Sequence, residues 1–592
     1  MRLSVRPHSI TRTCRKCLST SSTPAESSTS ARLRFAPSPT GFLHLGGLRM
    51  ALLDHILARK WKGKWLLRIE DTDQSRIVPG AVDALRRDLE WAGLNYDEGV
   101  GVGGSYGPYV QSERLDLYQH HAKELLSNGL AYECFCSADE LLAIRTDLHK
   151  RGIMRSYDGR CRHLTEEDKS RRKKAGHRYV VRFKSPGGYP ALPRDLVFGD
   201  LEESSNAPDQ SFEDYILLKS DNYPTYHLAS VVDDHHMDIT HVVRGEEWLP
   251  SLPKHHQLYN AFGWTPPQYA HIPVLVNPDG SKLSKRFGDV RVEQYRDKGY
   301  EPEALVNFLA LIGWDYISAL EAINTTDSQP KYGPDTEVLP PHHRADTHSL
   351  YEIFTLPQII GAFDLSHLTH RKAAVDKGKL DFLNKMTLRR KAGRLGKDGE
   401  MVEKGKEVLV GNETKEDADK ERKQVLERYT QLLKEQKVLK GCELVDDPEY
   451  VEKVFDAELP RFSFLPDMAG GSIYLFLEPQ YSAMEAESLL KTIDIENYIR
   501  NIENIILELE ERIQGRTELD EDLGWDAANH LTEKLRLRAR SEVMIPMRHA
   551  LTGRKKGPSV PTIMRLLGPE RTMNRLRAGL EYVKAKAASS HQ

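Results

Sequence analysis

The sequence predicts an α/β fold in which a Rossmann-like domain is interrupted by an inserted α+β domain and followed by an all-α region. A short apolar run at residues 33–36, a turn-rich segment at 37–41 and helically spaced leucines at 44–59 form the strand, turn and helix that open a βαβ unit. After about residue 120 the pattern becomes mixed, and beyond residue 300 helical spacing dominates.

The remaining segments complete this sheet and divide the chain. The apolar segment 65–69 predicts a second strand, and Glu70 stands at its C-terminal end, where doubly wound sheets bind ligands. Short strands resume at 242–244 and 272–276. The expected domains are the two halves of the Rossmann-like domain at residues 31–120 and 223–310, an inserted domain at 121–222, a helical domain at 311–385 and a second helical region at 386–592.

The composition is that of a globular protein with several domains. A chain of 592 residues exceeds what one hydrophobic core usually supports, so we expect about three to five domains. Apolar residues make up 39% and charged residues 29%, which excludes a disordered or collagen-like chain. No apolar run reaches the ~18 residues that a membrane span requires. The net charge of -3 gives no bulk attraction to a polyanion, so any nucleic-acid contact depends on local charge.

The first 30 residues have the composition of an organelle-targeting segment. Residues 1–25 are rich in Arg and Ser, and no acidic residue precedes Glu26. This bias is typical of a mitochondrial transit peptide rather than of a secretory signal, and a disordered basic tail is the alternative. We expect residues 1–30 to direct the chain to the mitochondrial matrix. We therefore assign no chemical role to Cys14 and Cys17, which form a CxxC pair in this segment.

Two segments predict contacts with a nucleotide. In residues 40–47 (TGFLHLGG), a turn passes into a helix, where free N–H groups favour an anion and His44 adds a donor. In residues 280–288 (GSKLSKRFG), Lys282 and Lys285 can neutralise charge that develops on a triphosphate. Either segment alone is explained equally well by a packed turn or a solvated charge run. Their joint occurrence in this order favours an ATP site with His44, Lys282 and Lys285 as catalytic residues.

Together the two segments resemble the HIGH and KMSKS signatures of class I aminoacyl-tRNA synthetases. The resemblance narrows to glutamyl-tRNA synthetases, of the mitochondrial type in view of the first 30 residues. It runs from residue 33 to about 310 and continues more thinly to the C-terminus. The segments that carry it are residues 34–41 (RFAPSPTG), 67–73 (LRIEDTD), 223–229 (YPTYHLA), 232–235 (VDDH) and 244–248 (RGEEW).

The resemblance implies a ligase that activates L-glutamate with ATP and Mg²⁺ and transfers it to the 3′ end of tRNA(Glu), with tRNA(Gln) left open as a second substrate. Arg34 and Arg244 suit the two carboxylates of glutamate, and Glu70 suits its ammonium group. The implied glutamate site is completed by Ala36, Ser38 and Tyr226. The implied ATP site comprises His44, Gly46, Glu247, Lys282, Leu283, Ser284 and Lys285.

Two residues depart from the family pattern. Gly47 stands where the general class signature has a second histidine, which removes one potential phosphate donor. Glutamyl-type enzymes commonly have glycine there, so we interpret Gly47 as a family variant. Ser230 stands where the pattern usually continues to Asn, and we therefore do not include it in the site.

The six cysteines predict no disulfide framework but include one potential metal site. Cys134 and Cys136 form a C-x-C pair, and Cys161 and His163 a C-x-H pair, both inside the expected inserted domain. Three thiolates and one imidazole can complete a structural zinc site, and some bacterial glutamyl-tRNA synthetases have zinc on this arrangement. Buried cysteines without metal are the alternative.

The resemblance also implies how the RNA is bound. It implies that the inserted domain binds the acceptor end, that residues 311–385 contact the stem and that residues 386–592 bind the anticodon. It also implies a monomer. Between Lys534 and Lys586 there are fourteen Lys or Arg and three Glu, a charge balance that can neutralise phosphates, although such runs are often only solvated helix faces.

Three other functions stay open from the sequence. A glutaminyl-tRNA synthetase shares the scaffold but typically has Met where Leu283 stands. A shortened paralogue that glutamylates a modified tRNA base lacks an anticodon-binding region, which disagrees with residues 386–592. A non-catalytic RNA-binding protein on the same fold is disfavoured because His44, Glu70 and Lys285 are present.

Overall fold

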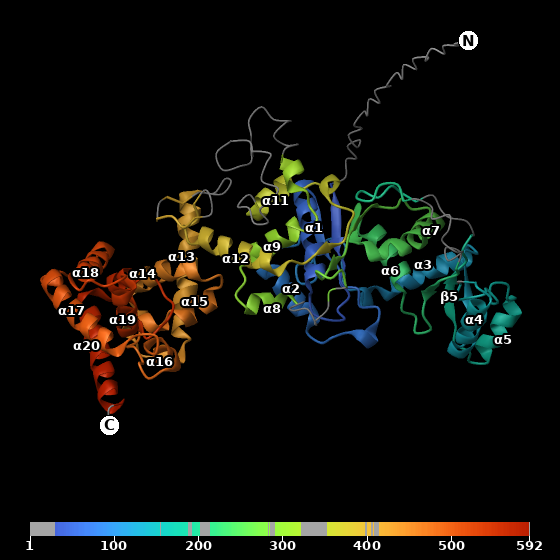
Figure 1. Cartoon of the computed structure of the whole chain (residues 1–592). Helices are drawn as coiled ribbons and strands as arrows, with labels where there is room; N and C mark the ends of the chain where they lie inside the picture. The colour runs from blue at the N-terminus through green and yellow to red at the C-terminus, as the bar shows by residue number, and fades with distance from the viewer. Residues whose placement is uncertain are drawn as a thin grey trace, which may run out of the picture.

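The computed structural model describes residues 30–153, 155–186, 192–201, 213–281, 283, 291–320, 352–396, 400–403, 406–407 and 414–590. Residues 1–29 of the expected targeting segment lie outside the described residues, as do Lys282, Ser284 and Lys285. Within the described part, no helix is both long enough and apolar enough for a transmembrane helix. The chain forms an elongated molecule, with the sheet in the middle, the inserted domain at one end and the C-terminal helices at the other (Figure 1).

The central sheet confirms the predicted Rossmann-like fold. Its five strands are all parallel and lie in the order β3-β2-β1-β7-β8. β1 has the next strand in the chain on one side and β7 on the other, so the strand order reverses between β1 and β7. In such sheets, ligands bind beyond the carboxyl ends of the strands at this switch point. The strands are β1 (Arg32–Phe35), β2 (Lys64–Leu67), β3 (Glu98–Gly99), β7 (His241–Gly245) and β8 (Gln268–Ile272).

The segment predicted as one strand at 272–276 is divided in the structure. β8 ends at Ile272, and the two residues of β9 (Leu275–Val276) pair instead with β10 (Ala373–Ala374). Pro273 separates them, and proline cannot donate a hydrogen bond to a central strand. The prediction of a single strand was therefore wrong, because the apolar run hid a change of partner.

α1 (Leu45–Lys60) connects the turn after β1 to the core. Its side chains Leu48, Leu52 and Ile56 are fully buried between the sheet and the helices of the following region. α9 (Pro302–Leu311) and α11 (Leu356–Ala362) pack against its other side. Because α1 is buried nearly all round, its N-terminus is held rigidly at the switch point.

The inserted segment forms a separate antiparallel sheet. β4 (Ala131–Cys134), β5 (Val180–Phe183) and β6 (Ile216–Leu218) pair in that order. The helices of this segment and the remaining helices of the central domain are α2 (Ala81–Trp91), α3 (Leu115–Ser127), α4 (Ala138–Lys150), α5 (Glu166–Lys174), α6 (Tyr226–His236), α7 (Leu252–Phe262) and α8 (Val292–Asp297).

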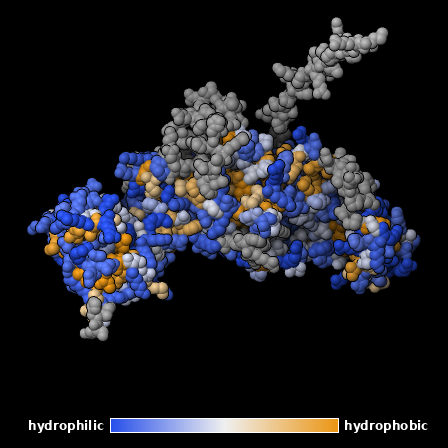
Figure 2. Space-filling view, viewed as in Figure 1, coloured by the Kyte–Doolittle hydropathy of each residue, from blue (hydrophilic) through white to orange (hydrophobic). Residues whose placement is uncertain are grey.

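Beyond α11 the described residues are helical, apart from β10, as the sequence predicts. Most of those from Leu388 onward have their own hydrophobic core, and the outer face in Figure 2 is mostly hydrophilic with scattered apolar side chains. The helices are α12 (Lys377–Lys391), α13 (Lys415–Lys434), α14 (Pro448–Glu458), α15 (Leu465–Gly471), α16 (Met484–Leu490), α17 (Ile495–Ile513), α18 (Glu521–Lys534), α19 (Ser541–Thr552) and α20 (Val560–Ser590), which is broken at Gly568.

A buried ion cluster joins the helical region to the central domain. Glu301, at the start of α9, is 1% exposed and pairs with Lys391 of α12 and Arg428 of α13, both at 2.9 Å. Burial opposes ionisation of Glu301, but the two cations outweigh it and hold its pKa below the usual value. α9, α12 and α13, which belong to two hydrophobic cores, therefore meet at the Glu301 carboxylate.

Glu301→Ala is expected to destabilise this junction by about 3 kcal/mol, because it removes the fully buried anion that Lys391 and Arg428 share. Glu303→Ala is the matched control, since Glu303 pairs with the same lysine at 2.9 Å but is 40% exposed. We expect less than about 1 kcal/mol there. Urea unfolding followed by circular dichroism measures both, and equal shifts would contradict the assigned role of Glu301.

Candidate active site

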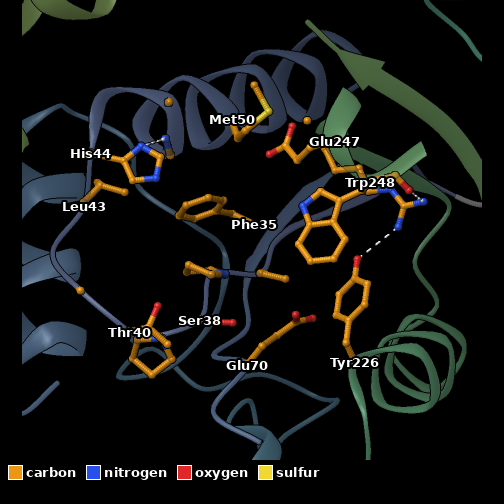
Figure 3. A pocket seen from close by; sticks show the side chains of 18 of the residues that line it. Phe35, Ser38, Thr40, Leu43, His44, Met50, Glu70, Tyr226, Glu247 and Trp248 are labelled. Carbon is orange, nitrogen blue, oxygen red and sulfur yellow. Dashed lines mark hydrogen bonds between the residues drawn. The ribbon is translucent and has the colours of Figure 1, made fainter. Parts of the chain in front are cut away.

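A cavity of about 1140 Å³ opens at the switch point between β1 and β7. It is bounded by the segments after β1, β2 and β7 and by the N-terminus of α1 (Figure 3). The described residues that the sequence assigned to the site all line it: Arg34, Ala36, Ser38, His44, Gly46, Glu70, Tyr226, Arg244, Glu247 and Leu283.

The lining residues divide into two ends. Glu70 and Tyr226 lie on one side of the cavity, and His44 and Glu247 lie on the opposite side, next to α1 (Figure 3). The expected glutamate and ATP residues are therefore separated within one continuous space. This arrangement places two ligands side by side.

His44 caps α1. Its Nδ1 accepts a hydrogen bond from the backbone N–H of Gly47 at 3.1 Å, which in the neutral ring leaves the proton on Nε2. The first-turn N–H groups of α1 and this imidazole therefore form a donor surface of the kind that binds phosphate.

Gly46 and Gly47 are closely packed against neighbouring side chains. A Cβ on Gly47 would approach Leu43 Cδ1 to 2.8 Å, and a Cβ on Gly46 would lie 3.1 Å from the His44 ring. A second histidine at position 47 would therefore require the Leu43 side chain to move.

A buried ion network supports the opposite end. Arg34 donates from Nε to Asp234 at 3.1 Å, and Arg68 donates from Nη1 to the same carboxylate at 2.7 Å. Arg68 Nη2 also donates to Glu70 at 3.0 Å. Burial alone would raise the pKa of Asp234, but the two guanidinium groups outweigh burial and hold it below the usual value. Glu70 behaves differently, because burial outweighs the arginines and raises its pKa.

Arg244 is buried but has neutral partners. Its guanidinium donates to His271 Nε2 at 3.0 Å, to the Tyr226 hydroxyl at 3.2 Å and to the Trp248 carbonyl at 3.4 Å. Among the described residues, no carboxylate forms an ion pair with it. Since burying an uncompensated charge is costly, this guanidinium is arranged for an anionic ligand.

His271, the ring that contacts Arg244, is itself held by Asp195. His271 Nδ1 donates to Asp195 at 2.7 Å, so the lone pair on Nε2 faces Arg244. Burial lowers the pKa of His271, and the positive charge of Arg244 lowers it further. The ring is therefore neutral. Asp195 therefore determines the tautomer and, through it, the position of the guanidinium.

Tyr226 and Trp248 form one wall. Their rings are 4.3 Å apart at an angle of 37° (Figure 3). Next to them, Gly245 allows Glu247 to fold back, because a Cβ at Gly245 would lie 2.1 Å from Glu247 Oε2. The segment 244–248 therefore supplies a cation, an aromatic surface and a carboxylate within five residues.

Sequence reasoning missed the residues that support the ligand-facing groups. Arg68 and Asp234 lie within two segments that carry the family resemblance, but no role followed from their pattern. The pairing of Asp195 with His271 links positions 76 residues apart, which no local pattern reveals. Ser230, omitted from the predicted site, does not line the cavity and is 1% exposed.

The cysteines of the inserted segment converge, but not with the expected histidine. One sulfur each from Cys134, Cys136 and Cys161 lies within 4.8 Å of the others, and all three are free thiols. His163 is exposed and outside this group. The turn that directs Cys161 inward, in which Leu164 N–H donates to the Cys161 carbonyl, leaves His163 facing solvent. The Tyr157 hydroxyl instead contacts Cys134 Sγ at 3.4 Å.

Comparison with known families agrees with this geometry. Residues 30–341 match the model of the class I tRNA synthetase catalytic domain (E and Q), and residues 414–580 match an anticodon binding domain. The fold and the site are thus those of a class I aminoacyl-tRNA synthetase.

Relatives of the chain identify its family within this class. The glutamate–tRNA ligases of Chlorobium luteolum and Clostridioides difficile are each 34% identical to the chain, covering 94% and 92% of it and 98% of their own lengths. A crystal structure of a glutamate tRNA ligase from Elizabethkingia meningosepticum in complex with its amino acid aligns with a TM-score of 0.73 at 30% identity, covering 94% of this chain and 100% of that one. The chain belongs to the glutamate–tRNA ligase family.

Asp234→Asn tests the buried network through its pH dependence. Because the folded pKa of Asp234 is lowered, its stabilisation is present above the unfolded pKa of about 3.9 and is lost as pH falls through the folded pKa. We expect the variant to be about 3–5 kcal/mol less stable at pH 7. The difference from wild type should shrink in acid, where Asp234 itself becomes neutral. A difference that does not change with pH, measured by denaturant unfolding, would contradict this.

Proposed function

We propose that the chain is a mitochondrial glutamate–tRNA ligase that activates L-glutamate with ATP and esterifies it to the 3′ end of tRNA(Glu). The observation that carries this proposal is Arg244, a buried guanidinium with neutral partners in the same cavity as the α1 N-terminus. The glutamate specificity agrees with the printed names of the relatives. The organelle assignment is supported by the composition of residues 1–30 alone.

Glutamate fits the end of the cavity that contains Arg244. The guanidinium of Arg244 suits the side-chain carboxylate, while Arg34 and Glu70 suit the α-carboxylate and the ammonium group. The Tyr226 hydroxyl, already held by Arg244 at 3.2 Å, restricts the side-chain position. Glutamine would place an uncharged amide against Arg244 and leave that charge buried without an anion.

ATP fits the end formed by α1. The α-carboxylate of glutamate attacks the α-phosphorus, the bond to the bridging oxygen breaks, and pyrophosphate leaves. The first-turn N–H groups of α1 and His44 bind phosphate oxygens, and Lys282 and Lys285 of the segment 280–288 add positive charge. Mg²⁺ would neutralise charge on the ATP phosphates, and Glu247, a carboxylate that lines this end of the cavity, would hold it.

In the second step, a hydroxyl of the terminal ribose attacks the activated carbonyl carbon, and AMP leaves. No side chain of the protein becomes covalently bound, so catalysis depends on positioning and on charge stabilisation. The protein acts as a monomer in this proposal. The exposed large apolar side chains among the described residues, such as Leu142, Met484 and Leu507, are spread over different domains rather than gathered in one patch.

Aminoacylation with purified tRNAs tests the proposal. Labelled glutamate and labelled glutamine are each offered with mitochondrial tRNA(Glu), mitochondrial tRNA(Gln) and cytosolic tRNA(Glu). The proposal predicts glutamate charging of mitochondrial tRNA(Glu) and no charging with glutamine. Glutamate on tRNA(Gln) would show the broader specificity that the sequence leaves open, and preferential charging of cytosolic tRNA would contradict the mitochondrial assignment.

Arg244→Gln tests the assigned role of the guanidinium. Loss of a buried charge-assisted contact is expected to raise the KM for glutamate by roughly 100-fold, or about 2.7 kcal/mol, and to leave the KM for ATP nearly unchanged. Arg59→Gln is the control, because Arg59 is 30% exposed and pairs with Asp97 outside the cavity. Equal losses for glutamate and ATP in steady-state kinetics would argue against the assignment.

We further propose a structural zinc ion in the inserted segment. The three free thiols of Cys134, Cys136 and Cys161 fit this ion, since their sulfurs already converge. The Tyr157 hydroxyl or a water completes the fourth position, rather than the exposed His163. Zinc would hold the strand end at β4 to the loop at residue 161.

Zinc content distinguishes the two possible ligand sets. Cys161→Ser is expected to lose the ion and to lower the melting temperature of the inserted segment. His163→Gln is expected to retain both, because its ring is outside the cluster. Metal analysis after gel filtration measures this, and loss of zinc from His163→Gln would restore the four-residue set predicted from the sequence.

A further inference from the structure

A second group of metal-ligating side chains lies where α3 meets α6. His120, His121 and Glu124 come from α3, and His236 is the last residue of α6. The two helices lie side by side on the inserted-domain side of the central sheet (Figure 1). None of these four residues lines the cavity. Along α6, His236 is about 15 Å from Tyr226, so the group is separate from the glutamate site.

Helix geometry places three potential ligands on one face. His120 and Glu124 are four residues apart and His121 and Glu124 are three apart, spacings that bring side chains together on an α-helix. One ligand atom from each of the three lies within 4.8 Å of the others. Two imidazole nitrogens and one carboxylate oxygen are a donor set that suits Zn²⁺, Ni²⁺ and related cations.

The central ligand is held rigidly by aromatic packing. His121 is only 7% exposed, and its ring meets Trp264 edge-on at 5.0 Å and 86° and Phe262 at 5.4 Å and 77°. His120 is exposed and Glu124 partly so. One fixed donor with two adjustable donors beside it can adapt to a cation without movement of the backbone.

The second ring nitrogen of His121 already has a partner. His121 Nδ1 is 3.0 Å from Glu124 Oε2, and His121 Nε2 is 2.7 Å from His236 Nε2. Without a cation, His121 Nδ1–H donates to Glu124, and the Nε2 lone pair of His121 accepts from His236 Nε2–H. When a cation takes Nδ1, the His121 proton moves to Nε2 and is donated to His236, whose own proton moves to Nδ1. Both rings stay neutral, and the contact at 2.7 Å is kept.

We propose that His120, His121 and Glu124 bind a divalent first-row transition-metal cation such as Zn²⁺ or Ni²⁺, with His236 as the hydrogen-bond partner that orients His121. Such outer partners commonly fix the ligating tautomer of a histidine. Three protein ligands leave a position for water. The site is distinct from the cysteine cluster, which lies in a different hydrophobic core.

The cation would stabilise the packing of α3 against α6, next to the active site. Asp233 and Asp234 precede the histidines of α6, and Asp233 is fully buried and holds Arg114 and Tyr118 of the α3 segment at 2.8 and 3.0 Å. A cation fixed through His236 therefore adds a further link between α3 and α6 at the end of that network.

Nickel titration of the untagged full chain tests the proposal. The chain is first given one equivalent of Zn²⁺, which the three thiolates of the cysteine cluster take in preference to the His and Glu donors, so that isothermal titration calorimetry with Ni²⁺ reports the second site. We expect one site per chain in the wild type. His120→Gln and Glu124→Gln change side chains that are not fully buried, so folding is preserved, and each should weaken Ni²⁺ binding by at least about tenfold.

His149→Gln is the matched control, because His149 is an exposed histidine on α4 outside both clusters. Its Ni²⁺ affinity should equal that of the wild type. His236→Gln, which keeps all three ligands, should bind more weakly than wild type but retain one site. Unchanged affinity in both His120→Gln and Glu124→Gln would overturn the proposal, as would the absence of a one-to-one site in the wild type.

Discussion

The carboxylate of Asp234, buried between Arg34 and Arg68, is the interaction on which the active site depends. Each guanidinium placed in the protein interior costs several kcal/mol unless an anion compensates for it. Asp234 provides that anion to one arginine from β1 and one that follows β2, while itself belonging to α6. The same contacts therefore fix the amino-acid end of the cavity and join the two halves of the central domain. Arg244 lacks such an anion among the described residues, and its position is determined instead by the neutral His271 and by Asp195 behind it.

The order of the strands explains why these groups share one cavity with the N-terminus of α1. The turn after β1 leads directly to His44 and α1, and the end of β7, on the other side of β1, carries Arg244. Residues some 200 positions apart are brought together because the sheet reverses its direction of growth between these two strands. Burial of α1 on nearly all sides keeps its N-terminus in place, so the donors do not have to reorganise when charge develops on the phosphate.

The sequence predicts the parts of the site that belong to local patterns. The turn at 40–47 could be recognised because glycines, a histidine and the start of a helix occur together, and the residues at 244–248 because they carry the family resemblance. Contacts between distant segments leave no such pattern. Asp195 lies outside every motif, and its role follows only from its position behind His271. In the structure His163, the predicted fourth member of the cysteine cluster, faces solvent, and alternation in sequence does not say which side of a turn faces inward. Pro273 similarly marks a change of strand partner that the apolar run around it conceals.

The central claim is that one cavity binds glutamate and the nucleotide together through the Asp234-supported arginines, Arg244 and the start of α1. Calorimetric binding of glutamyl-sulfamoyl-adenosine, a stable mimic of the activated amino acid, tests this most directly when it is compared with the glutaminyl analogue. The account predicts that the glutamyl compound binds at least about 100-fold more tightly than the glutaminyl one and that it is displaced by either ATP or glutamate. Equal affinity for the two analogues, or displacement by ATP alone, would contradict the account.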